Sequence, residues 1–332
     1  EEGDKRELVV QVWYPSIEVG NEKSPWQDYP FKRVKSIANS FQVPKFIAYA
    51  LDRVGTSSYI NSTPISNETF PVIIFSHGFE GFKTQNTTQI EELVSHGYIV
   101  FAVDHTYDAT LTIFPDGRKI ERAKKYCPDC EGDSLKFFNV FKPQIETRIF
   151  DIIFVINQIE KDKDDFSFNM DLDKIGVFGH SFGGGTSLGA SILDSRIKSC
   201  LSLDGWYTPI HPDIYNLGLS IPFLHLGRPE WETKHNYETL DYILDNKTSA
   251  SSYKISLVGS HHYDFTDSPH LSDLSSKFQL SSKLESKEIL YVTNTSVLGF
   301  FDEHLKSKKT NWLNNLKNNI HTTIKEFHPD EK

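Results

Sequence analysis

The sequence has 332 residues, of which 38% are hydrophobic and 24% are charged. This is an ordinary globular composition, and the length is ample for one large α/β domain carrying insertions. The formal net charge of −10 argues against the basic face that nucleic-acid binding requires, so we expect no nucleic-acid partner. No apolar run in the sequence approaches the ~20 residues of a transmembrane helix.

The chain begins with Glu1, and its one methionine is Met170. We therefore interpret the sequence as a mature or truncated form and expect a secreted or cell-envelope location. Cysteine is sparse, and Cys127-Pro-Asp-Cys130 fits a local disulfide, half of a metal site or two free thiols. A second such motif or a suitable histidine pair is missing from the neighbouring sequence, which argues against zinc.

The N-terminal part predicts one strand followed by helices. Residues 7–14 alternate in polarity, include β-branched and aromatic side chains and end at Pro15, which predicts an early strand. From about 26 to 55, apolar residues recur at helical spacing among lysines and arginines. We interpret this N-terminal helical segment as a pair of amphipathic helices packed on the body. A cap or an interface-seeking surface is the alternative.

A β-α-β unit follows this segment. The apolar run 70–75 leads into a turn, residues 87–96 have a helical pattern, and residues 98–103 form a second apolar strand. This order predicts neighbouring parallel strands joined by a right-handed crossover. Residues 106–141 are irregular, charged and aromatic, so we interpret them as an insertion.

The second half of the chain continues to alternate between helices and short apolar strands. Strongly periodic helices are predicted over 145–159, 296–305 and 311–327. Short strands are predicted over 175–178, 199–204, 221–226 and 253–258. The pattern predicts an α/β fold in a single domain spanning 1–332, with a mostly parallel sheet and helices on both faces.

The stretch 174–186 has the pattern of a nucleophile elbow. A strand runs into Gly179-His-Ser181-Phe-Gly183, and a Gly- and Ala-rich helix follows. In such an elbow Ser181 lies on a sharp strand-to-helix turn that exposes its hydroxyl, and the two glycines keep side chains out of the crowded turn. The alternative is a Gly-rich turn after any parallel strand.

A serine that transfers acyl groups needs a histidine as base and an acid to orient the histidine. In hydrolases with such an elbow, the acid and then the histidine follow the serine in the chain. Asp204 ends the strand after the elbow helix, and Glu230, one strand later, is the alternative acid. His261 and His262 follow the strand 253–258, and only one of two adjacent side chains can face Ser181.

The remaining parts of the predicted site come from the elbow and from earlier turns. The backbone N–H groups of Phe79 and Phe182 are the predicted oxyanion hole, with Gly78 letting the chain bend toward the serine. We expect His180, Trp206 and Tyr207 to contribute to the substrate pocket. This chemistry needs no metal ligand and no cofactor.

These motifs resemble the platelet-activating factor acetylhydrolase family, the plasma-type branch of lipoprotein-associated phospholipases A2 and its bacterial relatives. The resemblance runs in order over about residues 70–305. It rests on Phe75-Ser-His-Gly-Phe79, Gly179-His-Ser-Phe-Gly-Gly184, Leu203-Asp-Gly-Trp206 and Gly259-Ser-His-His-Tyr-Asp-Phe265. The family histidine lies three positions before the phenylalanine of the last motif, which implies His262, and Asp267 matches an acid found there in the family.

The resemblance implies an α/β-hydrolase fold and a calcium-independent serine esterase. Such an enzyme removes short or oxidised sn-2 acyl chains from phospholipids, at a lipid surface or on monomers. The chain departs from the family at residues 104–108, where the family has a basic-acidic pair, and in 106–141, which has no counterpart. The alternative functions are a general carboxylesterase or polyester (cutinase-like) hydrolase with the same triad, and an inactive hydrolase fold used for binding. The sequence makes no prediction of oligomeric state.

Overall fold

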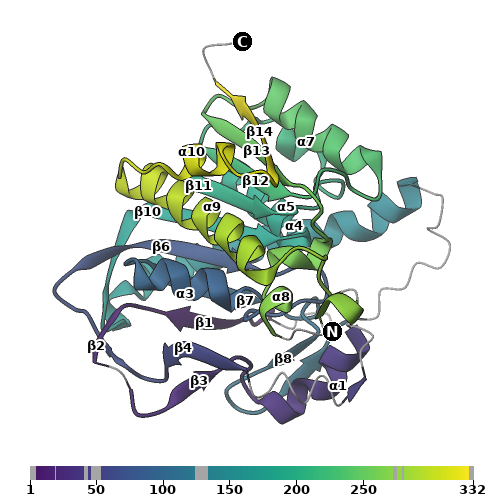
Figure 1. Ribbon diagram of the computed structural model, residues 1–332. Coiled ribbons are helices and arrows are strands. Elements are labelled where there is room, and N and C mark those ends of the chain that lie inside the picture. Colours follow the sequence, from purple (N-terminus) through teal and green to yellow (C-terminus); the bar gives the residue numbers. More distant parts are fainter. Residues whose placement is uncertain are drawn as a thin grey trace.

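The computed structural model describes residues 5–18, 20–40, 44–45, 54–123, 134–271, 275–278 and 280–328. Its centre is an eight-stranded sheet with the order β1-β7-β6-β10-β11-β12-β13-β14 (Figure 1). The six inner strands run parallel, and the two edge strands are antiparallel to their neighbours. In sheet order the strands are β1 (Val9–Trp13), β7 (Ile99–Asp104), β6 (Thr69–Ser76), β10 (Asn169–His180), β11 (Ile197–Leu203), β12 (Phe223–Gly227), β13 (Ser252–Leu257) and β14 (Thr322–Phe327). The predicted α/β-hydrolase fold with a mostly parallel sheet is confirmed.

The strands are apolar on both faces because helices cover the sheet on both sides. In β6, Val72 and Ile74 pack into one hydrophobic core, while Ile73 and Phe75 point into the other, and all four side chains are fully buried. This alternation follows from the two-residue period of a strand. The inner strands therefore appear in the sequence as continuous apolar runs rather than as alternating ones.

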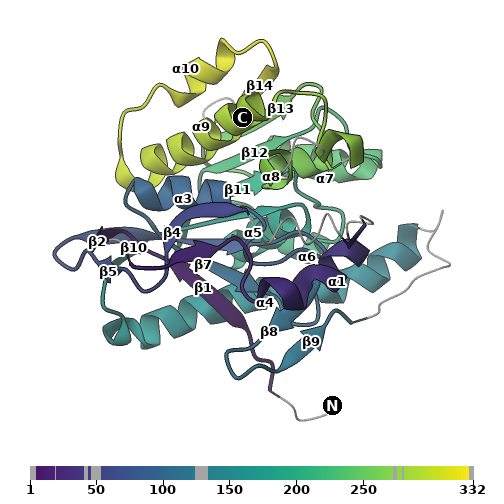
Figure 2. The same ribbon diagram turned by 60° about the horizontal axis from the view of Figure 1, so that its bottom comes forward.

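Each core is completed by helices from different parts of the chain. One core includes side chains of α4 (Ser134–Lys161), α5 (Phe182–Leu193) and α7 (Lys234–Asn246). The opposite core includes side chains of α3 (Thr87–Ser95), α9 (Ser286–Lys306) and α10 (Trp312–Lys317). Figure 2 shows α9 and α10 on one side of the sheet and α4 on the other. None of the helices among the described residues has the length and apolar character needed to cross a membrane.

Smaller elements surround this sandwich. They are the strand pairs β2 (Ser16–Glu18) with β5 (Thr63–Pro64), β3 (Lys23–Pro25) with β4 (Gly55–Tyr59), and β8 (Leu111–Ile113) with β9 (Lys119–Glu121), and the short helices α6 (Pro212–Tyr215) and α8 (Ser268–Leu271). The helix α1 (Pro30–Ser40) lies between β3 and β4 in the chain. The helix α1 falls within the predicted N-terminal helical segment of about 26–55, whereas β3 ends before this segment and β4 begins at its end. Residues 41–43 and 46–53 lie outside the described residues.

The predicted insertion 106–141 has the wrong C-terminal boundary. The helix α4 begins at Ser134 instead of near residue 145, and it contains Pro143. Proline in a helix interior removes one hydrogen bond and normally ends the helix, so the sequence pattern points to a boundary there. Cys127 and Cys130 lie outside the described residues.

The predicted C-terminal helix 311–327 is also wrong in its second half. Only α10 is helical, and Thr322–Phe327 forms the edge strand β14 against β13. In β14 the side chains alternate between half-buried and exposed, which suits an edge strand. The β-branched and aromatic side chains of this segment favour a strand, and the edge of β13 supplies partners for the β14 backbone.

Candidate active site

Ser181 lies on a sharp turn between β10 and α5, in the backbone conformation φ +55° and ψ −118°. Few residues with a side chain adopt this conformation, so the surroundings must hold it in place. The Ser181 N–H donates to the Leu203 carbonyl at 2.9 Å, and the Trp206 N–H donates to the Ser181 carbonyl at 2.8 Å. A Cβ atom on Gly183 would overlap the Ser76 carbonyl, which explains why glycine follows the turn. These contacts have the geometry of the predicted nucleophile elbow.

Asp204 and His262 meet at the carboxyl edge of the sheet, where Asp204 follows β11 and His262 follows β13, with β12 between these two strands. His262 Nδ1 donates to Asp204 Oδ2 at 2.6 Å. The carboxyl of Asp204 is fully buried, and it also accepts from the Arg228 backbone N–H at 3.0 Å and from Arg228 Nε at 2.7 Å. Burial alone would raise the pKa of Asp204, but the hydrogen bond from His262 and the charge of Arg228 outweigh it and hold this pKa below its usual range. The carboxylate is therefore ionised near neutral pH and able to orient the imidazole.

The two adjacent histidines have different surroundings. His262 begins a 3-10 turn (His262–Phe265), and its side chain is 24% exposed. The His261 side chain is exposed, and its backbone N–H donates to Asp264 Oδ2 at 2.8 Å. The geometry favours His262 as the base, in agreement with the phenylalanine spacing at Phe265.

Glu230, the alternative acid, is exposed on the segment after β12. Arg228, from the same segment, is partly buried and donates to Asp204 through Nε. Sequence reasoning missed Arg228, because a strand-end arginine beside a proline carries no signal that it will bind an acid one strand away.

We expect Asp204→Asn to lower kcat about 10⁴-fold, because the amide cannot hold the imidazole in the required tautomer. Glu230→Gln is expected to leave kcat within about twofold of wild type, since exposed substitutions rarely act at a distance. Steady-state hydrolysis of 4-nitrophenyl acetate by both variants measures the difference. A larger loss in Glu230→Gln would move the acid to the segment after β12.

The predicted oxyanion donors belong to two segments that meet at Ser181. Phe182 is the first residue of α5, where backbone N–H groups have no partner within the helix. Gly78 lies against the nucleophile, and a Cβ atom added there would be 3.4 Å from the Ser181 Cβ. Phe79 follows directly, and its ring lies 6.0 Å from the Phe182 ring. The turn that carries Phe79 thus lies beside the nucleophile, as an oxyanion hole requires.

Four aromatic rings gather beside this turn. Phe141 from α4 lies 5.0 Å from Trp206 and 5.5 Å from Phe79, and Trp206 lies 5.2 Å from Phe182. The rings of Phe79, Phe141 and Trp206 are partly exposed. We name these four residues the aromatic cluster. Sequence reasoning missed Phe141, because it assigned this residue to the insertion and not to α4.

Two predicted pocket residues are buried away from this opening. Tyr207 is fully buried, and its hydroxyl donates to Ser202 Oγ at 2.8 Å and contacts His225 Nδ1 at 2.7 Å. His180 is 1% exposed, and its ring lies 4.5 Å from the ring of His262. This burial argues against the predicted substrate contact for both side chains.

A second serine, histidine and aspartate lie beneath the oxyanion turn. His105 Nε2 accepts from Ser76 Oγ at 2.9 Å, and His105 Nδ1 donates to Asp151 Oδ2 at 2.8 Å. Burial, together with the nearby charge of Arg148, lowers the pKa of His105 to about 4, so its ring is neutral near pH 7. Ser76 and His105 are fully buried, so this group supports the strand end before Gly78 and is closed to substrate.

Asp104, which precedes His105, forms ion pairs with Arg33 and Lys83 in the same region. It accepts from the Lys83 backbone N–H at 2.7 Å and lies 3.3 Å from the Arg33 guanidinium. Burial alone would raise the pKa of Asp104, but the charges of Lys83 and Arg33 outweigh it and lower the pKa to about 2. Because this value is below that of an unfolded aspartate, the folded state binds fewer protons, and stability is lost as pH falls from about 4 toward 2.

We therefore expect the free energy of unfolding to fall by about 1 kcal/mol more in wild type than in Asp104→Asn between pH 6 and pH 3. Urea denaturation at both pH values measures this difference. Equal losses in the two proteins would show that Asp104 is not the group that titrates.

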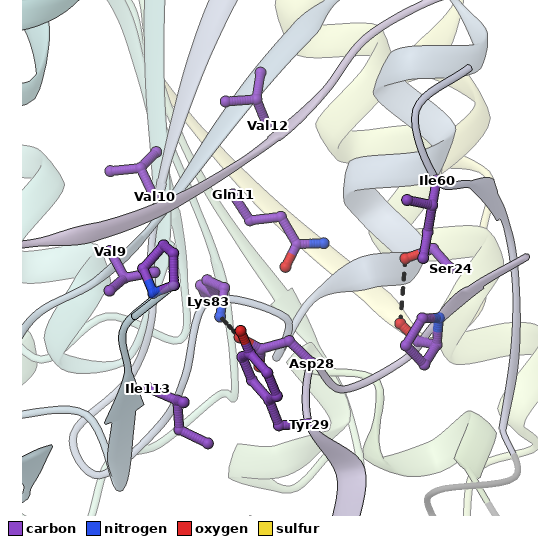
Figure 3. A pocket seen from close by; sticks show the side chains of 12 residues that line it. Val9, Val10, Gln11, Val12, Ser24, Asp28, Tyr29, Ile60, Lys83 and Ile113 are labelled. Atoms are coloured by element: carbon purple, nitrogen blue, oxygen red, sulfur yellow. Dashed lines mark hydrogen bonds and ion pairs between the residues drawn. The ribbon is translucent and has the colours of Figure 1, made fainter. Parts of the chain in front are cut away.

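A cavity of about 510 Å³ lies on another side of the molecule, against β1 and β3 (Figure 3). Valines of β1 form its apolar wall, and Lys83 and Asp28 form an ion pair of 2.6 Å at its edge. None of the residues that line it belongs to the elbow, the acid or the base. In the part of the chain that the structure describes, no group of three or more His, Cys, Asp or Glu side chains is arranged to hold a metal ion.

The chain is similar to known proteins along most of its length. The family model for platelet-activating factor acetylhydrolase, isoform II, matches residues 1–324. The platelet-activating factor acetylhydrolase of Canis lupus familiaris is 27% identical over 328 residues, covering 90% of this chain and 72% of the relative. The platelet-activating factor acetylhydrolase of Gallus gallus is 24% identical over 344 residues, covering 92% of this chain and 80% of that relative.

Among solved structures, a ferulic acid esterase from Streptomyces cinnamoneus superposes with a TM-score of 0.75 at 25% identity, covering 96% of this chain and 89% of the other. The family match covers nearly the whole chain, and the structural neighbour is also an esterase. The chain therefore belongs to the platelet-activating factor acetylhydrolase, isoform II, family, and it is a carboxylic ester hydrolase with the α/β-hydrolase fold.

Proposed function

We propose that the chain is a serine esterase that uses Ser181, His262 and Asp204 as a catalytic triad and removes short or oxidised sn-2 acyl chains from phospholipids. The observation that carries this proposal is the 2.6 Å hydrogen bond between His262 and the buried Asp204, at the strand ends beside the strained Ser181 turn. The names of the relatives from dog and chicken support the substrate class.

In the proposed reaction, His262 Nε2 takes the proton of Ser181 as its Oγ attacks the ester carbonyl carbon. The N–H groups of Phe79 and Phe182 stabilise the oxyanion, and one such donor contributes about 3 kcal/mol in comparable enzymes. The imidazolium returns its proton to the leaving alcohol as the carbon–oxygen bond breaks. Water then attacks the acyl-enzyme with the same base and regenerates Ser181. Side chains and backbone groups supply every step, so we expect hydrolysis to be independent of calcium.

The aromatic cluster supports a short acyl chain. Its rings stand beside the predicted oxyanion hole, where the acyl group of a bound ester lies. The rings of Phe141 and Trp206 have centroids 5.0 Å apart, and we expect a long alkyl chain to be obstructed by them. An acetyl group or a short oxidised chain fits such a site with less displacement of aromatic side chains.

A general aryl carboxylesterase is the second candidate function, and the same cluster favours it. Aromatic rings pack well against the ring of an aromatic acid. The structural similarity to the ferulic acid esterase supports this alternative. An inactive binding protein, the remaining alternative, has no need of the strained serine and the ionised Asp204.

A substrate panel in buffer containing EDTA tests the proposal. We expect kcat/KM for 1-alkyl-2-acetyl phosphatidylcholine to exceed that for the 2-palmitoyl analogue by at least about 100-fold, because each methylene beyond the pocket must displace a ring. Methyl ferulate is the comparison ester. Rates measured with the lipid in vesicles and with the lipid as monomers distinguish activity at a surface from activity in solution. Preference for methyl ferulate over the acetyl lipid would favour the carboxylesterase, and loss of hydrolysis restored by calcium would contradict the proposed mechanism.

A further inference from the structure

A chain of three hydrogen bonds joins the base, the nucleophile turn and the oxyanion turn. His180, next to Ser181, contacts the His262 carbonyl oxygen through Nε2 at 2.9 Å. Its Nδ1 lies 2.7 Å from Nε2 of Gln85, and Gln85 Oε1 accepts from the Gly78 N–H at 3.1 Å. Gln85 is 6% exposed and His180 is 1% exposed.

The direction of each bond in this chain is fixed. The Gly78 N–H can only donate, so the side chain of Gln85 must present its oxygen to Gly78 and its NH₂ to His180. His180 Nδ1 must then accept, which places the ring proton on Nε2, where it donates to the carbonyl of His262. Every group in the chain therefore has its required partner with one amide orientation and one tautomer.

We propose that Gln85 is a positioning residue of the hydrolase: through His180 it holds the turn of His262 and the oxyanion turn at Gly78 in one fixed arrangement around Ser181. This inference rests on the proposed function, because it assigns roles to the predicted base and oxyanion hole. It adds a residue that lies outside every motif discussed in the sequence.

The residues around Gln85 leave room for its side-chain amide and hold its backbone in place. A Cβ atom on Gly81 would overlap Gln85 Oε1, so the turn leaves room for this oxygen only because residue 81 is glycine. The Gln85 carbonyl accepts from the Asp267 N–H at 3.0 Å, and the Asp267 carboxylate accepts from the Thr87 N–H at 2.8 Å. Residue 85 and the start of α3 are thus tied to the segment after His262 by main-chain contacts as well.

In this arrangement the neutral ring of His180 links Gln85 to the carbonyl of His262. Burial, together with the charge of nearby His262, lowers the pKa of His180 to about 3. The other charged groups that act on it are Asp204 and Arg228. A proton on Nδ1 would make this nitrogen a donor that faces another donor, the NH₂ group of Gln85. The chain of hydrogen bonds therefore requires a neutral His180 ring.

The test compares Gln85→Met and Gln85→Glu with Gln27→Met. Gln27 is a matched control, since it is 1% exposed and its amide binds Thr84 Oγ1 at 2.8 Å, next to Gln85 but outside the chain of bonds. With 4-nitrophenyl acetate at pH 8, we expect Gln85→Met to lower kcat by about 10- to 100-fold and to change KM by less than about threefold, because misplacement of catalytic groups acts on the chemical step. Gln27→Met is expected to keep kcat within about threefold of wild type.

Gln85→Glu provides a readout that a purely structural role would not change. A carboxylate still accepts from the Gly78 N–H, but it needs a protonated His180 as its other partner. The activity of Gln85→Glu relative to wild type is therefore expected to rise as pH falls from 8 to 6. Equal kcat values for Gln85→Met and Gln27→Met, or a relative activity of Gln85→Glu that does not change with pH, would overturn the inference.

The proposed hydrogen-bond directions can also be tested on the wild-type protein, which avoids any effect of a substitution on folding. In protein labelled with ¹⁵N-histidine, NMR at pH 8 is expected to show the ring proton of His180 on Nε2, and a proton on Nδ1 would contradict the proposed bond directions. Failure of the proposed function has a different signature, because hydrolysis would then be absent or unchanged by Ser181→Ala, whatever residue occupies position 85.

Discussion

Replacement of Ser181 by alanine is expected to lower kcat for 4-nitrophenyl acetate by about 10⁵- to 10⁶-fold. The variant keeps the Cβ atom and the oxyanion turn but loses the attacking oxygen, so only binding and oxyanion stabilisation remain. Covalent labelling by a fluorophosphonate, detected by mass spectrometry, should also disappear from the peptide that contains residue 181.

Ser187→Ala is the matched control for this experiment. Ser187 lies in the same helix α5, is fully buried, and its hydroxyl has no hydrogen-bond partner among the described residues. Its replacement is expected to leave both kcat and labelling close to wild type. If Ser181→Ala retained a tenth of wild-type activity, another nucleophile would have to be sought.

Removal of the His262 imidazole is expected to lower kcat by about 10⁵-fold or more, because the Ser181 hydroxyl then has no base. His261→Ala is the natural control, since the two residues are adjacent in one turn and only His262 of the pair contacts Asp204. We expect His261→Ala to keep at least about a third of wild-type kcat, as an exposed side chain contributes little. The rate of fluorophosphonate labelling measures the effect on acylation alone.

The outcomes of this pair separate chemistry from folding. Equal losses in both variants would show that the turn His262–Phe265 depends on both residues for its structure. A loss confined to His261→Ala would place the base one residue earlier. In neither case would the predicted assignment of His262 survive.

The sequence predicts the reacting groups better than their surroundings, for a physical reason. Ser181 is recognisable because its strained turn requires glycine on both sides, and Asp204 because it ends an apolar strand. Phe141 is not recognisable, since Pro143 hides the helix that carries it. Gln85 lies in a polar turn, and nothing local indicates that its amide will reach across to His180.

Contacts between distant segments are the least predictable from the sequence. The segment Thr322–Phe327 lies close behind a helical pattern in the sequence, and it forms a strand by pairing with the edge of β13. The burial of Tyr207 was missed for a similar reason: its partners, Ser202 and His225, come from two neighbouring strands of the completed sheet. Local patterns predict local structure, whereas contacts between distant segments appear only once the fold is known.

The placement of β1 and β14 at opposite edges of one sheet has a consequence for how the protein is made. Strand β13 receives its last partner only when residues 322–327 have left the ribosome, after the whole of 258–321. Until then, a strand with unpaired backbone groups is exposed, and such edges are templates for association with other chains. The nascent chain therefore carries an aggregation-prone edge while residues 258–321 are being made, and pairing with the short strand β14 ends this exposure.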